Sequence, residues 1–154
     1  MTPAKDTSDV AEDLNRLMAE EAEAFLRYFQ MRFRLHGRGR GAAAKFFEDA
    51  LKETLEHADA IAQRISSLGH IPKLNIHLSL TGGPIPPAEA LAEALDIEQQ
   101  ALDAYREFLP RVEGHPTLEG FIRKQIEVET EHVQELVDIV RATTPLKLVE
   151  KPTQ

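Results

Sequence analysis

The sequence contains no cysteine and no tryptophan, and it has little glycine, at 8 of 154 residues. Without cysteine, disulfides, thiolate metal sites and cysteine-based catalysis are excluded, so any bound metal must take histidine and carboxylate ligands. Scarce glycine together with frequent alanine and leucine favours helices. No apolar run approaches the ~18 residues that a membrane-spanning helix needs, so we expect no membrane association.

Basic residues are outnumbered, with 18 Lys and Arg against 26 Asp and Glu, which gives a formal net charge of −8. A surface of this sign makes nucleic-acid binding an unlikely function and suits a protein that attracts cations. The first residues form no apolar signal segment, which makes the cytoplasm the expected compartment. At 154 residues the whole chain fits one domain with a single sizeable core.

Four long helices are expected, at about residues 8–36, 42–69, 87–113 and 116–143, followed by an irregular tail over residues 144–154. Short glycine-containing breaks join the first two and the last two helices, which predicts antiparallel neighbours. The segment 70–86, at about 17 residues, is long for a loop. Extended at ~3.3 Å per residue, it could span a helix that is ~40 Å long. Two hairpins around one long crossover predict an all-α four-helix bundle with an up-down-down-up path.

Each expected helix carries an apolar stripe with a polar residue near its middle. A carboxylate in a protein core is costly unless it is paired. Several carboxylates that converge would cost more unless cations hold them together, so the pattern predicts a metal site inside the bundle. The polar residues at mid-stripe are Glu21, Thr54, Glu98 and Glu129, with His57 and His132 one turn after Thr54 and Glu129.

Glu129 and His132 form a Glu-x-x-His motif, which places both side chains on one helix face about one turn apart. Di-iron carboxylate bundles take a single Glu from each of two helices and a Glu-x-x-His from each of the other two. Glu21 and Glu98 fit the single-Glu helices, and His57 fits the second motif. The predicted metal ligands are therefore Glu21, His57, Glu98, Glu129 and His132, and they suit iron, with manganese or zinc as alternatives.

Thr54 departs from this pattern, because it stands where the second motif needs its Glu. Three glutamates would then face the four positive charges of two divalent ions. Glu53, four residues before His57, is a candidate substitute ligand, although it is offset by ~100° from position 54 around the helix. The Thr54 hydroxyl could instead bind a water or, weakly, a metal. Two metals with altered coordination, one metal and a degenerate site all remain open.

At this point the residues resemble the bacterioferritin branch of the ferritin-like superfamily, over about residues 10–142. The stretches that carry the resemblance are Leu14–Leu17 with Glu21 and Tyr28, Glu56–Asp59, Asp96–Ala101 and Glu129–His132. The resemblance implies that Glu21 and Glu98 are terminal iron ligands, that Glu129 bridges two irons, and that Tyr28 lies beside the site.

Two further departures bear on cofactor and assembly. Leu55 occupies the place where bacterioferritins have the haem-binding Met, so we expect no haem. The tail contains Pro145 and Pro152, so the small fifth helix that lines the four-fold channel of a ferritin cage is expected to be missing. We therefore expect a homo-oligomer of at least a dimer, with shells of 12 or 24 subunits as alternatives.

Three functions follow from these residues. The leading hypothesis is a bacterioferritin-like non-haem iron protein that oxidises Fe(II) with O₂ or peroxide, a ferroxidase, and that stores iron if it forms a closed shell. The second is a di-metal or mono-metal oxidase acting on an organic substrate, which would need an apolar channel to the site. The third is a non-catalytic bundle with a degenerate metal site. Tyr105, on the third stripe, is expected to be a core residue, with hydrogen bonding to the site as the alternative.

Overall fold

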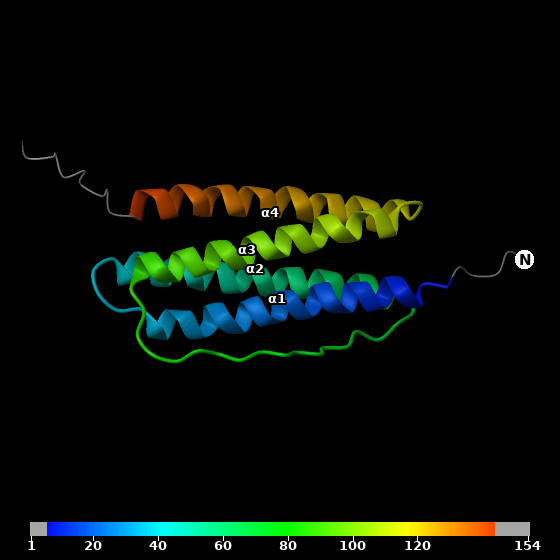
Figure 1. The fold of residues 1–154 in the computed structure, drawn as a ribbon. Helices are drawn as coiled ribbons and strands as arrows, with labels where there is room; N and C mark the ends of the chain where they lie inside the picture. The colour runs from blue at the N-terminus through cyan, green and yellow to red at the C-terminus, as the bar shows by residue number, and fades with distance from the viewer. Residues whose placement is uncertain (1–5, 144–154) are drawn as a thin grey trace, which may run out of the picture.

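The computed structural model describes residues 6–143 and shows four long helices in one bundle (Figure 1). They are α1 (Ser8–Arg34), α2 (Arg40–Ser67), α3 (Pro87–Phe108) and α4 (Pro116–Thr143), and a short 3-10 helix, η1 (Leu109–Val112), follows α3. No β-strand occurs among residues 6–143. The predicted all-α four-helix bundle is therefore confirmed. None of the described helices is long and apolar enough to cross a membrane.

The turn of each helical hairpin contains a glycine with a positive φ angle. Gly39, which precedes α2, and Gly114, which precedes α4, both have positive φ angles, of 85° and 84°. Glycine adopts this conformation without the steric penalty that a Cβ would bring. As a result α2 folds back on α1 and α4 folds back on α3, as Figure 1 shows.

The crossover between α2 and α3 runs along α1 as an extended segment without regular secondary structure (Figure 1). Near its start the amide of Lys73 donates to Asn15 Oδ1 at 2.8 Å. At its end Ile85 pairs with Leu35 in a parallel bridge, just beyond α1. The crossover thus travels from the start of α1 to its end and lets α3 begin beside the start of α2.

The predicted third helix, 87–113, is interrupted before its end. The α-helical part stops at Phe108, and Leu109–Val112 continue as a 3-10 turn. Pro110 explains the change, because proline lacks the N–H that an α-helical hydrogen bond needs at that position. The expectations for the tail, including Pro145, Pro152 and the missing fifth helix, concern residues 144–154, which lie outside the described range.

The hydrophobic core consists of two clusters with a polar layer between them. One cluster contains Tyr28 and Phe47, and the other contains Tyr105, Ile61 and Ile122. The buried polar residues between the two clusters are Glu21, Thr54, Glu98 and Glu129, all less than 10% exposed. The sequence therefore places its polar mid-stripe residues at one level of the bundle, where side chains from four helices meet.

Candidate metal centre

Glu129, from α4, is the central residue of the polar layer and is only 1% exposed. Its Oε1 lies 3.0 Å from Nδ1 of His57, on α2. Its Oε2 lies 3.6 Å from Nδ1 of His132, one turn further along α4. One carboxylate therefore faces both imidazoles, one with each oxygen.

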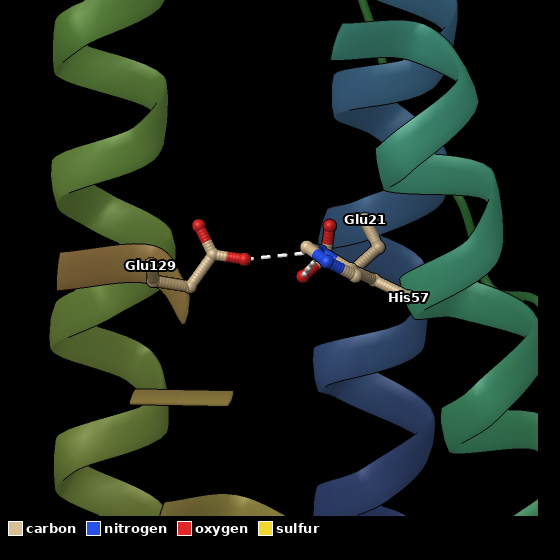
Figure 2. Close-up of side chains that lie close together, drawn as sticks. All are labelled: Glu21, His57 and Glu129. Atoms are coloured by element: carbon tan, nitrogen blue, oxygen red, sulfur yellow. Dashed lines mark ion pairs between the residues drawn. The ribbon is translucent and has the colours of Figure 1, made fainter. Parts of the chain in front are cut away.

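Glu21, His57 and Glu129 form the first of two groups of candidate ligands. His57 Nδ1 lies 3.5 Å from Glu21 Oε1, so the imidazole stands between the two carboxylates (Figure 2). Each residue offers one ligand atom, and these atoms all lie within 4.8 Å of one another. Three helices, α1, α2 and α4, contribute to this group.

Glu98, Glu129 and His132 form the second group, and they meet the same 4.8 Å criterion. His132 Nδ1 lies 3.9 Å from Glu98 Oε2, which comes from α3. The rings of His57 and His132 stack at a centroid distance of 6.0 Å. All five residues predicted as ligands thus lie together, and Glu129 belongs to both groups.

Two buried tyrosines hold the outer glutamates. Tyr28, on α1, donates to Glu98 Oε1 on α3. Tyr105, on α3, donates in return to Glu21 Oε1 on α1, at 2.6 Å. Tyr28 was expected beside the site, and Tyr105 in the core with hydrogen bonding to the site as the alternative; Tyr105 lies in the core and also makes that hydrogen bond. The two tyrosines share one spacing, because each follows the glutamate of its own helix by seven residues.

Thr54 and Glu53 face different cavities. The buried Thr54 donates its hydroxyl to the carbonyl of Leu51 at 3.0 Å and lines a cavity of about 290 Å³ together with Glu21 and Glu98. Glu53 is half-exposed, with Oε2 3.3 Å from His132 Nε2, and lines a second cavity of about 190 Å³. The candidate substitute therefore approaches the other side of the site, beside His132, rather than the cavity that Thr54 lines.

The charges of the layer shift the pKa values of its members. Burial alone lowers the pKa of His57, but the Glu129 and Glu21 carboxylates outweigh burial and raise it to about 10. Contact with Glu129 also raises the pKa of His132, against the effect of burial. Burial and the charge of Glu129 raise the pKa of Glu98. Burial would raise the pKa of Glu129 too, but the two histidines hold it below its usual value. The layer therefore favours the charged form of both imidazoles, and a bound cation would replace their protons.

His57 Nδ1 and Glu129 Oε2 form no hydrogen bond of good geometry, although His57 Nδ1 lies 3.0 Å from Glu129 Oε1 and Glu129 Oε2 lies 3.6 Å from His132 Nδ1. A metal ion placed between these atoms would satisfy both of them. Three carboxylates with two imidazoles are a donor set that suits iron, manganese or zinc. The residues therefore fit a divalent metal. Gln125, another buried side chain that sequence reasoning missed, also leaves its Nε2 unpaired.

Comparisons with known proteins agree with this arrangement. Residues 11–144 match the ferritin-like domain family. No curated protein matches the sequence. A ferritin-like diiron-carboxylate protein from Bacillus anthracis is 23% identical, with a TM-score of 0.78 over 89% of this chain and 99% of that one.

Two other solved structures are similar to this chain. The dodecameric, bacterioferritin-related thioferritin of Bacteroides fragilis is 24% identical, with a TM-score of 0.78 over 89% of this chain and 87% of that one. The bacterioferritin of Rhodobacter capsulatus is 28% identical, with a TM-score of 0.73 over 90% of this chain and 87% of that one. The predicted resemblance to ferritin-like and bacterioferritin-like proteins is thereby confirmed.

Proposed function

This chain belongs to the ferritin-like domain family, and we propose that it binds iron in its polar layer and oxidises Fe(II) as a bacterioferritin-like, non-haem protein. The observation that carries the proposal is the position of Glu129, whose two oxygens face two different histidines. A carboxylate in that position can bridge two metal ions. The diiron-carboxylate character of the B. anthracis neighbour supports iron as the metal.

The two groups of residues divide the ligands between two ions. Glu21, His57 and Glu129 would hold one ion, and Glu98, Glu129 and His132 the other. Iron bound there supplies one electron per Fe(II) to O₂ or to peroxide. Since both histidines must lose their proton before they can act as ligands, binding releases protons and becomes weaker at low pH.

The cavities favour ferrous ions over an organic substrate. The cavity beside Thr54 is lined by Glu20, Glu21, Glu23 and Glu98, and this ring of acids attracts cations. Burial and the charges of neighbouring glutamates raise the pKa of Glu20, as clustered acids require. An oxidase for apolar substrates needs an apolar channel, whereas four of the ten residues that line this cavity are glutamates.

The second candidate is a non-catalytic bundle with a degenerate metal site, and a specific observation favours it. The histidines already lie against carboxylates, with His57 Nδ1 3.0 Å from Glu129 Oε1, so ion pairs alone could maintain the layer. This candidate differs from the first in its metal stoichiometry.

We also propose that the chain forms a homo-oligomer. Phe29 and Phe33 are 48% and 74% exposed along α1, and Leu55 on α2 is 55% exposed. Exposed apolar side chains of this size favour association. Dodecameric assembly of the B. fragilis neighbour is consistent with a shell, which iron storage would require. Mass measurement in solution distinguishes a dimer from 12 or 24 subunits, and a monomer would contradict the proposal.

Anaerobic titration of metal-free protein with Fe(II), followed by exposure to air, tests the main function. We expect two tight sites per chain and the prompt appearance of oxidised-iron absorbance. Glu129→Ala should lose both sites, since both groups share this residue. Asp138→Ala, which changes an exposed carboxylate of the same helix, is the control and should keep both. Absence of tight sites in the wild type would contradict the proposal and favour the non-catalytic bundle with a degenerate metal site.

A further inference from the structure

His132 turns its two ring nitrogens toward different carboxylates. Its Nδ1 lies 3.6 Å from Glu129 Oε2 and 3.9 Å from Glu98 Oε2, within the second group of candidate ligands. Its Nε2, on the far side of the ring, lies 3.3 Å from Oε2 of Glu53, on α2. Nδ1 is therefore the nitrogen that would bind an ion beside Glu98 and Glu129, and Nε2 is left to Glu53.

Metal binding at one nitrogen of an imidazole determines which nitrogen carries the proton. A ligating histidine is neutral and gives one lone pair to the metal, so the proton stays on the other ring nitrogen. With a metal on Nδ1 of His132, the Nε2–H group points at the Glu53 carboxylate. A charge-assisted bond of this kind is about 2.7–2.9 Å long, and the Glu53 side chain, which is 50% exposed, has room to close the remaining gap. Glu53 can therefore fix both the tautomer and the orientation of the His132 ring.

Glu53 is less well placed to bind the ion itself. It belongs to neither group of residues whose ligand atoms lie within 4.8 Å of one another. It approaches the His132 ring at Nε2, whereas Glu98 and Glu129 approach the ring at Nδ1. The contact that Glu53 makes is thus with a candidate ligand rather than with the position of the ion.

His57 lacks a partner of this kind. Its Nδ1 lies 3.0 Å from Glu129 Oε1, and within residues 6–143 no carboxylate pairs with its Nε2. The sequence shows a matching difference between the two motif helices. Glu53 comes four residues before His57 on α2, whereas Val128 comes at the same distance before the histidine of α4. The two imidazoles therefore have unequal support, although both face Glu129.

We propose that Glu53 is a positioning residue, which accepts the Nε2 proton of His132 and so holds Nδ1 toward the ion shared with Glu98 and Glu129. The inference rests on the proposed function, because it describes how the chain supports one ligand of the proposed metal site. Glu53 acts through His132 and does not need to touch the ion. The ion beside His132 is therefore bound more tightly than it would be without Glu53, whereas the ion beside His57 gains nothing from it.

Cobalt(II) titration of the metal-free protein tests the inference through affinity, without relying on iron oxidation. Removing the outer hydrogen-bond partner of a metal-binding histidine weakens metal affinity by about 10–100-fold. Because Glu53 is half-exposed, we expect Glu53→Ala to lie at the lower end, with one Co(II) bound about tenfold more weakly and the other unchanged. The wild type and Glu53→Ala should both bind two Co(II) per chain.

Two further variants show whether the effect belongs to this contact. Glu53→Gln keeps an acceptor oxygen of the same reach but without the charge, so its loss of affinity should be smaller than that of Glu53→Ala. Glu131→Gln removes an exposed carboxylate next to His132 in sequence and is the matched control for a change of charge. It should leave both affinities unchanged, since no ion pair joins Glu131 to His132 in the described part of the chain.

The proton on Nε2 gives a second readout, which a loss of stability alone would not change. Bound Co(II) shifts the N–H proton of each ligating imidazole away from the other resonances in the proton NMR spectrum. His132→Gln identifies the signal of His132 by removing it. This proton should exchange with water faster in Glu53→Ala than in the wild type, because its acceptor is gone, while the proton of His57 should exchange at the same rate in both.

The outcomes separate this inference from the proposed function. Wild-type affinities and wild-type proton exchange in Glu53→Ala would overturn the inference and leave the metal site standing. Loss of one Co(II) from Glu53→Ala, with the signal of His132 unchanged, would show that Glu53 is itself a ligand and would also overturn it. Equal losses of affinity in Glu53→Ala and Glu131→Gln would reduce the effect to long-range charge, which overturns it as well. Absence of Co(II) binding by the wild type would remove the proposed function, and the inference with it.

Discussion

The hydrogen bond from Tyr105 to Glu21 can be removed with little other change. Tyr105 is 1% exposed and lies in one of the two apolar clusters, so Tyr105→Phe keeps the ring and its packing. The variant deletes only the hydroxyl that donates to Glu21 Oε1 at 2.6 Å. Hydrogen bonds to charged groups contribute about 1.5–3 kcal/mol. We expect the free energy of unfolding of the metal-free protein to fall by that amount.

Thermal unfolding in the presence of a chelator measures this loss. For a chain of this length each kcal/mol shifts the midpoint by about 2–4 °C, so the midpoint of Tyr105→Phe should fall by about 3–12 °C. Tyr28→Phe is the matched variant, because Tyr28 is fully buried and donates to Glu98. Its midpoint should fall less, because the raised pKa of Glu98 makes the acceptor partly neutral and neutral pairs contribute about 0.5–1.5 kcal/mol.

The two variants should also affect different metal ions. Tyr105→Phe should weaken the ion held by Glu21, His57 and Glu129, while Tyr28→Phe should weaken the other. Titrations with Co(II) that follow two separate binding steps can resolve this difference. If Tyr105→Phe unfolds within about 1 °C of the wild type and binds both ions unchanged, the hydrogen bond neither stabilises the layer nor positions Glu21, and the reasoning is refuted.

Three other predictions concern pH, metal and a distant ion pair. In the metal-free protein the pKa of His57 is about 10 rather than 6.5, so its ion pairs stabilise the fold fully below pH 6.5 and are lost as pH rises through 10. Denaturant titrations between these pH values should show a falling free energy of unfolding. The same fall of stability with pH in His57→Gln would contradict this. Free Co(II) at about a hundred times its dissociation constant should add about 2.7 kcal/mol to the free energy of unfolding and raise the midpoint of thermal unfolding by about 5–11 °C. In calorimetric scans a chelator should reverse this gain, and Glu129→Ala should not show it. Asp13 is 8% exposed and forms ion pairs with Arg111 and, at 3.0 Å, with Arg16. In denaturant titrations Asp13→Asn should lower the free energy of unfolding by about 1–3 kcal/mol, while the number of metal ions bound per chain stays the same. A loss of bound metal would show that these ion pairs also position the site.

Helix periodicity explains why the candidate ligands could be identified from sequence. A residue in the middle of an apolar stripe must face the core, and the middles of four antiparallel helices of similar length lie at one level. Glu21, Glu98 and Glu129 satisfy both conditions, and all three are buried in one layer. The Glu-x-x-His spacing then predicts that His132 lies beside Glu129, as the structure shows.

The position of Glu53 could not be predicted in the same way. Glu53 and Thr54 are neighbours in sequence, but on a helix they point ~100° apart. In the structure that angle is enough to place Thr54 in the cavity with Glu21 and Glu98, and Glu53 in the cavity with His132. Which side of the site each residue faces depends on how α2 is rotated against the other helices. A single sequence does not contain that rotation.

The two tyrosines show how the polar layer is joined to the core. Each lies seven residues after the glutamate of its own helix, which is ~10 Å further along the helix axis. Because helical side chains lean toward the N-terminus, each tyrosine leans back toward the layer. Tyr28 belongs to one apolar cluster and Tyr105 to the other, so the layer is held from both ends by rings that pack with the core.

This double attachment fixes Glu21 and Glu98 but leaves position 54 free. The hydroxyl of each tyrosine reaches the glutamate of the opposite helix, so the core orients both outer carboxylates before any metal binds. Thr54 is equally buried, yet its side chain bonds only to its own helix. The layer is thus rigid where a core residue supports it and open where Thr54 lines the cavity.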